Sequence, residues 1–181
     1  PGVATQHRWP PTRQEALTRV AAFTPRMGGH YASRRNHDLG PDDRGNVSLL
    51  SPYVRRRLVT ERELVEAALG AHSLKGAEKY VQEVFWRSYW KGWLEARPSV
   101  WSGYRFGLEA DLERMDGARG LAKAVARAEA GDTGLACFDA WAHELVDTGY
   151  LHNHARMWFA SIWIFTLGLP WRLGADFFLR H

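Results

Sequence analysis

The segment around Glu83 combines a carboxylate, a guanidinium and several aromatic side chains, which together could bind a ligand. Glu83 and Arg87 are four residues apart, so on a helix they lie on the same face. Such a pair is commonly a solvated surface pair that contributes a few tenths of a kcal/mol. Four aromatic residues flank it, however: Trp86, Tyr89, Trp90 and Trp93. A buried acid–base pair needs a further polar partner to offset its desolvation. A ring-shaped polar ligand would supply one, so a surface pair and a ligand site both remain open.

A second candidate is the segment Asn46-Val-Ser-Leu-Leu-Ser-Pro-Tyr53. Ser48 and Ser51 place two hydroxyl groups three residues apart, just before Pro52. Proline is common at the first position of a helix, and the N–H groups at a helix start can bind an anion. The simpler interpretation is that Ser51 caps a helix that begins at Pro52, and the sequence alone favours this capping role.

The third candidate is the string His152-Asn-His-Ala-Arg-Met157. Two histidines at i and i+2 do not share a helical face, so they make a poor zinc site, and we predict no metal centre. Asn153 as a helix cap is the simplest interpretation. A more specific interpretation is that Arg156 enters an apolar core, which must then accommodate its charge.

The composition limits the classes of protein to which the chain can belong. It has 181 residues, 45% of them hydrophobic and 24% charged, with a net charge of +4, which is typical of a globular domain. The single cysteine, Cys137, excludes an intramolecular disulfide. The longest apolar run, 157–170, is too short for a straight membrane helix, and no secretory leader is evident. We therefore predict a cytoplasmic protein without a membrane segment.

Helical spacing and capping residues predict the elements that must position these side chains. Capping boxes at Thr12–Glu15 and Thr60–Glu63 open two helices. Further helices are predicted at 73–95, 118–130, 138–148, 153–167 and 171–181, whereas 30–51 is predicted to be a loop and 98–116 to be irregular. No segment alternates with a period of two over the length of a strand, so the predicted fold is all-α.

Taken in order, several short strings resemble the C-terminal FAD-binding domain of the photolyase/cryptochrome family. They are Tyr31-Ala-Ser-Arg-Arg-Asn36, Ser48-Leu-Leu-Ser-Pro-Tyr53, Glu83-Val-Phe-Trp-Arg87, Gly131-Asp-Thr-Gly134, Phe138-Asp139-Ala140, Thr148 to Met157, Ala160-Ser161 and Trp171. The resemblance implies one helical domain over residues 1–181. We expect this domain to be incomplete at its C-terminus, because the family continues with an Asp-Gly-Asp segment, and to lack the family's N-terminal antenna domain.

The resemblance also implies roles for individual residues. Flavin contacts are implied at Tyr31, Val47, Ser48, Leu49, Leu50, Ser51, Tyr80, Glu83, Arg87, Asn153 and Arg156. Catalytic roles are implied at Glu83, Trp86, Asn153, Met157 and Trp171, with Trp171 in a chain of tryptophans that re-reduces the flavin. Contacts to DNA are implied at Arg35, Trp86, His154 and Met157. Two positions depart from the family pattern, since Val47 replaces a hydroxyl residue and Arg57 stands where glycine is common.

The function implied is light-driven electron transfer from reduced FAD, which splits UV-induced pyrimidine dimers in DNA. The parent activity is that of a deoxyribodipyrimidine photo-lyase, and whether this chain is itself active stays open. Two alternatives are a cryptochrome-like blue-light flavoprotein without repair activity, and a flavin-free helical module that binds nucleic acid or has a structural role. The oligomeric state is not predicted.

Overall fold

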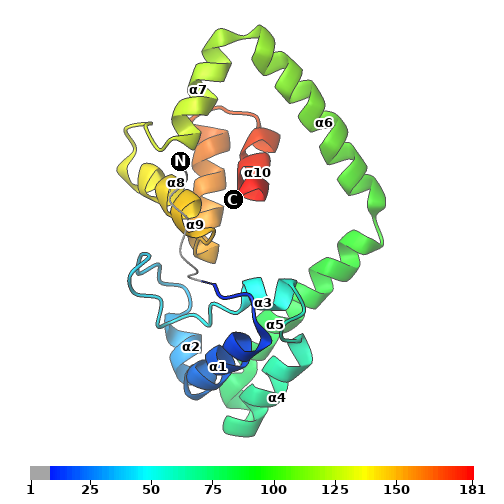
Figure 1. Ribbon diagram of the computed structural model, residues 1–181, viewed down its shortest axis with the longest axis vertical. Helices are drawn as coiled ribbons and strands as arrows, with labels where there is room; N and C mark the ends of the chain where they lie inside the picture. Colours follow the sequence, from blue (N-terminus) through cyan, green and yellow to red (C-terminus); the bar gives the residue numbers. More distant parts are fainter. Residues whose placement is uncertain (1–8) are drawn as a thin grey trace. The chain divides into compact units, whose positions relative to one another are not determined.

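The protein is described by a computed structural model that covers residues 9–181. These residues form helices and loops and contain no strand, which confirms the all-α prediction (Figure 1). The chain divides into two compact units, an N-terminal unit that ends at Ala96 and a C-terminal unit that begins at Arg97. Each unit is described by itself below.

The N-terminal unit contains five α-helices and one 3-10 turn in its described part. They are α1 (Arg13–Phe23), η1 (Thr24–Arg26), α2 (Gly29–Arg34), α3 (Ser51–Arg55), α4 (Glu61–Ala71) and α5 (Leu74–Glu95). Both predicted helix starts are confirmed, because the hydroxyls of Thr12 and Thr60 accept hydrogen bonds from the N–H groups of Glu15 and Glu63. At Thr60 the capping box is complete, since the Glu63 carboxylate accepts the Thr60 N–H in return.

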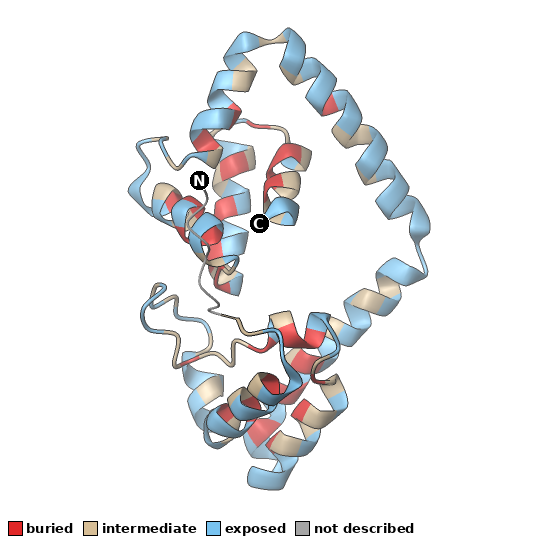
Figure 2. Cartoon of the chain, viewed as in Figure 1, coloured by how far each residue is buried: buried red, intermediate tan, exposed pale blue. Residues whose placement is uncertain are grey.

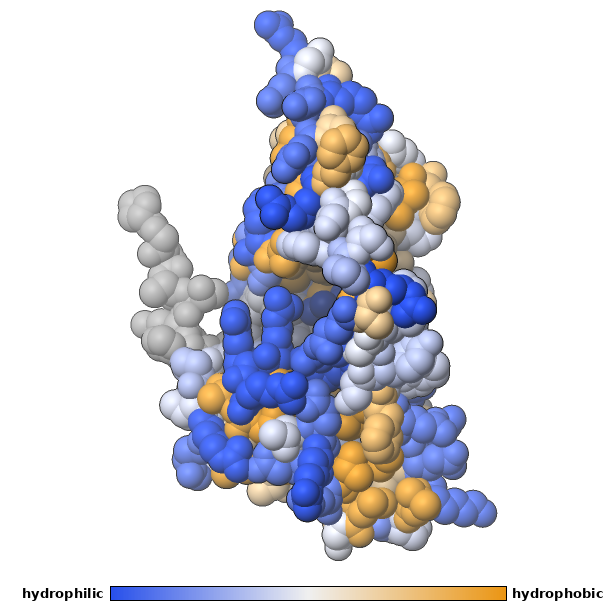
Figure 3. Space-filling view, turned by 90° about the vertical axis from the view of Figure 1, so that its right-hand side faces the viewer, coloured by the Kyte–Doolittle hydropathy of each residue, from blue (hydrophilic) through white to orange (hydrophobic). Residues whose placement is uncertain are grey.

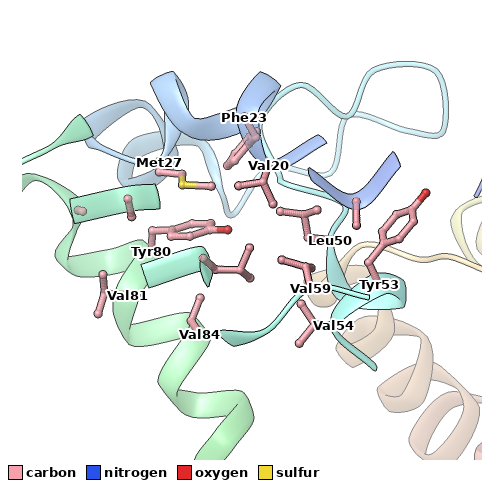
Figure 4. Close-up of a cluster of buried hydrophobic side chains, with 14 residues drawn as sticks. Val20, Phe23, Met27, Leu50, Tyr53, Val54, Val59, Tyr80, Val81 and Val84 are labelled. Atoms are coloured by element: carbon pink, nitrogen blue, oxygen red, sulfur yellow. The ribbon is translucent and has the colours of Figure 1, made fainter. Parts of the chain in front are cut away.

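The core of the N-terminal unit forms where α1, α3, α4 and the first half of α5 meet (Figure 4). Val20, Leu50 and Tyr80 lie within this cluster and are almost fully buried. Along α5 the buried residues end at Val84, and the rest of the helix is largely exposed (Figure 2). The first half of α5 therefore anchors the helix, and the second half presents side chains to the outside of this unit.

The C-terminal unit contains five α-helices and one π-helical turn. They are α6 (Pro98–Gly117), α7 (Arg119–Glu129), α8 (Ala136–Thr148), α9 (Asn153–Ser161), η2 (Ile162–Thr166) and α10 (Trp171–Arg180). Its core is a stack of aromatic rings in which the centroids of Phe138 and Phe159 lie 4.1 Å apart. The buried indole of Trp163 donates its N–H to the Pro170 carbonyl at 2.9 Å, so this polar group is satisfied.

Two predicted segments are wrong in whole or in part. Residues 98–116 are not irregular, because α6 spans them. Its one buried residue is Asp111, and only Leu108 and Met115 pack against the core, so the sequence carries no clear apolar stripe. The 30–51 segment is only partly a loop, since α2 runs to Arg34. Asn46 holds the remaining loop by donating hydrogen bonds to the carbonyls of Arg34 and His37, at 2.9 and 2.8 Å.

Two predicted caps are also wrong. Ser51 is the first residue of α3, and the N-cap is Leu50, whose side chain makes no capping hydrogen bond. At α9 the cap is His152 rather than Asn153, because the His152 ring nitrogen Nδ1 accepts the N–H of His154 at 3.2 Å.

Within residues 9–181, no helix has both the length and the apolar character that a membrane crossing requires.

Candidate functional site

A pocket of about 220 Å³ opens in the N-terminal unit beside the buried part of α5. It is lined by Tyr31, Ser48, Leu50, Ser51, Val54, Glu61, Leu64, Tyr80, Glu83, Val84 and Arg87. These residues come from α2, the loop before α3, and helices α3, α4 and α5. The lining therefore combines apolar side chains of the core with hydroxyl, carboxylate and guanidinium groups.

Tyr80 carries a buried hydroxyl group to this pocket. Its ring is held edge-on by Tyr31, with centroids 5.1 Å apart, and the residue is 3% exposed. The hydroxyl has no hydrogen-bond partner among the described residues. Burial raises the pKa of Tyr80, and the nearby Ser48 hydroxyl offsets only part of this rise. Tyr80 is thus a neutral phenol that lies near the Ser48 hydroxyl but makes no internal hydrogen bond of normal geometry, so a ligand can still bond to it.

The charged residues of the pocket form ion pairs with other helices rather than with each other. Glu83 pairs with Arg35, at the end of α2, at 2.8 Å. Arg87 lies with its Nε 3.5 Å from a carboxylate oxygen of Glu61, at the start of α4. The Arg87 Nε is buried and makes no hydrogen bond. Of the two alternatives left open by the sequence, the surface pair of Glu83 with Arg87 is therefore wrong, and both side chains line the pocket.

The pocket brings together seven of the flavin contacts implied by the sequence in this unit: Tyr31, Ser48, Leu50, Ser51, Tyr80, Glu83 and Arg87. Val47 and Leu49 do not line it. Leu49 has a φ of 54°, a left-handed conformation that is uncommon for a leucine. This backbone turn lies between two pocket-lining residues, Ser48 and Leu50.

The aromatic residues after Val84 do not enclose the Glu83 and Arg87 side chains as the sequence suggested. Trp86, Tyr89 and Trp90 are each about half exposed, at 53%, 55% and 52%. Their rings meet edge to face, with centroid distances of 5.5 and 5.4 Å. Because it is half exposed, Trp86 is available for stacking with a partner. Figure 3 shows that hydrophobic and hydrophilic residues are mixed on the face it presents.

The remaining predicted flavin and DNA contacts lie in the C-terminal unit, at the start of α9. Asn153 and Met157 are exposed. Arg156 does not enter the apolar core; its Nε donates to the Leu151 carbonyl at 3.0 Å, and its guanidinium lies 5.8 Å from the Phe178 ring. His154 stacks on His152 with centroids 5.6 Å apart, and its buried Nδ1 has no hydrogen-bond partner among residues 9–181.

Trp171 begins α10 and is 48% exposed. Its ring centroid lies 6.0 Å from that of Tyr104 on α6, and Tyr104 stacks on Trp101 at 5.4 Å. Three aromatic rings therefore form a row within the C-terminal unit. Tyr104 was not among the predicted residues, because nothing in its spacing relative to Trp171 indicates a contact.

Four pocket residues were also missed: Val54, Glu61, Leu64 and Val84. The predicted helix start at Thr60–Glu63 was a usable signal for Glu61, since it places this carboxylate in the first turn of α4. Nothing in the sequence links Glu61 to Arg87, however. No group of three or more metal-binding side chains occurs within residues 9–181.

Comparison with known proteins assigns the chain to a family. Residues 80–181, more than half of the chain, match the family model for the FAD binding domain of DNA photolyase. The chain belongs to this family. The photolyase match confirms the predicted fold class, and the cofactor that it assigns is FAD.

Comparison with individual proteins supports the same family assignment. The chain is 29% identical to a deoxyribodipyrimidine photo-lyase of Neurospora crassa over 96% of its own length and 28% of that protein. It is 35% identical to a photo-lyase of Streptomyces griseus over 80% of its length and 30% of that protein. A putative mitochondrial cryptochrome DASH of Neurospora crassa is 26% identical over 82% of the chain and 24% of that protein. The chain thus spans less than a third of these relatives, and no solved structure matches it.

The pocket residues fit part of an FAD molecule. Pockets for whole drug-sized ligands usually measure about 300–1,000 Å³, so this one suits a portion of a dinucleotide. The Tyr80 hydroxyl and the Arg87 Nε are buried and make no hydrogen bond, although the Nε lies 3.5 Å from the Glu61 carboxylate. A ligand's oxygen atoms would supply the missing hydrogen bonds. The Glu61 and Glu83 carboxylates accept hydrogen bonds and suit hydroxyl or amine donors rather than a second anion.

Proposed function

We propose that the chain is part of one photolyase-like FAD-binding domain, and that the parent protein repairs pyrimidine dimers in DNA by light-driven electron transfer. The family match over residues 80–181 carries this proposal. The pocket of the N-terminal unit supports it, because buried polar groups without partners are costly unless a ligand completes them. When bound and reduced, FAD supplies the electron, and the protein supplies binding and orientation.

The chain's own residues would divide this task. Tyr80, Glu83 and Arg87 would hold one part of the cofactor in the pocket of the N-terminal unit. In the C-terminal unit, Asn153 and Arg156 at the start of α9 are proposed as further flavin contacts. Trp86 in the first unit and Met157 in the second are both exposed, and each is proposed to contact the bases of a flipped-out lesion. Trp171, in its row with Tyr104, would carry an electron to the flavin. Arg35 and His154 would contact the DNA.

A second candidate is a blue-light flavoprotein that leaves dimers intact, and the match to a cryptochrome DASH relative is the observation in its favour. Both functions require bound flavin, whereas a flavin-free helical module requires none. We further infer a cytoplasmic location.

The deciding experiment uses the purified chain, its visible spectrum, and an oligonucleotide with one thymine dimer. A flavin spectrum with dimer loss only under blue light supports repair. A flavin spectrum with photoreduction but intact dimers supports the sensor. A colourless protein that takes up no added FAD excludes both functions for this chain.

A further inference from the structure

Arg57 adopts a backbone conformation that is unfavourable for its side chain. It follows the end of α3 with a φ of 58°, in the left-handed region. A Cβ atom is strained there, and helix ends of this kind usually carry glycine. The structure thus explains why glycine suits the position, and it raises the question of what the arginine contributes.

The Arg57 side chain reaches forward to the start of α4. Its guanidinium lies 3.3 Å from the Oε2 of Glu61, whereas the Oε1 of Glu61 lies 3.5 Å from the Nε of Arg87. Each carboxylate oxygen therefore faces a different arginine. Glu61 is only 18% exposed, while Arg57 is 63% exposed. Glu61 also lies in the first turn of α4, where the helix dipole favours a negative charge.

Two of these three residues also line the pocket. Glu61 and Arg87 both border it, and Arg57 stands behind Glu61. Without the carboxylate, Arg87 would have no ion-pair partner among the described residues, and its long side chain would be free to leave the pocket wall. A partly buried ion pair that fixes a guanidinium reduces the entropy lost when a ligand binds.

We propose that the row Arg57–Glu61–Arg87 positions the Arg87 guanidinium for FAD, with Glu61 as the positioning residue and Arg57 as its outer support. This inference rests on the proposed function, since it assumes that the chain binds FAD. The turn after α3 sets the left-handed backbone at this position, and an arginine there accepts the strain that a glycine would avoid in return for a cation beside Glu61.

The test is titration of FAD into the flavin-free full chain, followed by flavin fluorescence. Glu61→Gln removes the charge with little change in shape, and we expect it to raise the Kd for FAD about fivefold. The matched control is Glu66→Gln. Glu66 lies on the same helix, pairs with Arg62 on the surface and does not line the pocket. This control should leave the Kd unchanged.

A second pair of variants separates positioning from folding. Arg57→Gly relieves the strained backbone but removes the outer cation, so its thermal midpoint should rise by roughly 2 °C while its Kd for FAD rises about two- to threefold. Arg57→Lys keeps the charge and should keep the wild-type affinity. A protein that becomes more stable and yet binds more weakly cannot be explained by partial unfolding.

The possible failures are distinct. If the wild-type chain takes up no FAD, the proposed function fails and this inference falls with it. If the wild type binds but Glu61→Gln matches Glu66→Gln in affinity, the row does not position Arg87, and the proposed function is untouched. An Arg57→Gly protein that binds FAD as tightly as wild type likewise overturns the role of Arg57.

Discussion

Tyr80 shows at the scale of one residue how the fold prepares a side chain for a ligand. Its ring is buried against Phe23 and Tyr31, with centroids 6.1 and 5.1 Å away. The hydroxyl, however, makes no hydrogen bond of normal geometry to a described residue, although the Ser48 hydroxyl lies near it. Burial raises the pKa of Tyr80, so the phenol keeps its proton at physiological pH. Its stabilising contribution is therefore apolar, and its polar group remains for the cofactor.

Tyr80→Phe should for this reason separate stability from binding. Removing an unpartnered buried hydroxyl raises the free energy of unfolding of the flavin-free chain by about 1 kcal/mol. The same change removes a hydrogen bond to FAD and raises its Kd about fivefold. Urea unfolding and flavin titration measure the two effects. A flavin-free variant that is less stable than wild type would mean that the hydroxyl has an internal partner.

Only some of the pocket residues and of their partners could be predicted from the sequence. The resemblance identified Tyr80, Glu83 and Arg87, and the structure brings all three to one pocket. The partners of the charged residues could not be predicted, because Arg35 and Glu61 lie on other helices, and helical spacing gives information only about neighbours on the same helix. The conformation of Arg57 is likewise set by the turn between α3 and α4.

At the scale of the elements, α4 is joined to α1 by one carboxylate. Glu63 closes the capping box at Thr60 and also accepts a hydrogen bond from Arg13, the first residue of α1. The Arg13 guanidinium, followed by the N–H and hydroxyl of Thr60, lowers the pKa of Glu63 to about 2. Because the folded-state pKa is lowered, this stabilisation is present above pH 4.5 and is lost as the pH falls towards 2.

Glu63→Gln should remove this pH dependence. The urea midpoint of the variant should lie below that of wild type at pH 6, and the two should converge between pH 4.5 and pH 2. The measurement is the difference between the two midpoints at each pH, which cancels other titrating groups. Glu66→Gln serves as the control on the same helix. A gap that stays constant down to pH 2.5 would show that Glu63 does not act through its charge.

Asp139 organises the start of α8 in a comparable way. Its carboxylate accepts hydrogen bonds from the N–H groups of Thr133 and Gly134, both at 2.9 Å, and from the Thr133 hydroxyl. Burial raises the pKa of Asp139, but these bonds outweigh it and the net pKa is lowered. Asp139→Ala should cost about 2 kcal/mol of unfolding free energy. Asp147→Ala, at an exposed position of the same helix, should change it by less than about 0.5 kcal/mol.

Elements with caps or a buried face could be predicted, and those without could not. Helices α5, α7 and α8 begin and end close to their predicted positions, and α4 begins at its predicted capping box. Helix α6 was missed because its one buried residue is the charged Asp111, which pairs with Arg172 of α10 at 3.3 Å. This long-range ion pair holds α6 in place together with Leu108 and Met115, which pack against the core of the C-terminal unit.

At the scale of the whole molecule, charged and aromatic side chains of the N-terminal unit offer two different kinds of contact to DNA. Arg55 and Arg56, at the end of α3, are exposed and form no ion pair with a described residue. Trp86 is exposed on α5. Arginines bind phosphates whatever the base sequence, whereas an exposed indole stacks on unpaired or flipped bases. The proposed function requires both kinds of contact.

The effects of the arginines and of Trp86 can be distinguished by measuring binding to one duplex that contains a thymine dimer and to one that does not. Arg55→Gln with Arg56→Gln should weaken binding to both duplexes equally and lower the slope of log K against log salt by about 1.8, because each lost phosphate contact removes about 0.9. Trp86→Ala should leave that slope unchanged and reduce the preference for the damaged duplex about tenfold. Arg62→Gln, exposed but paired with Glu66, is the matched control for charge. Equal loss on both duplexes for Trp86→Ala would mean that its indole does not contact the lesion.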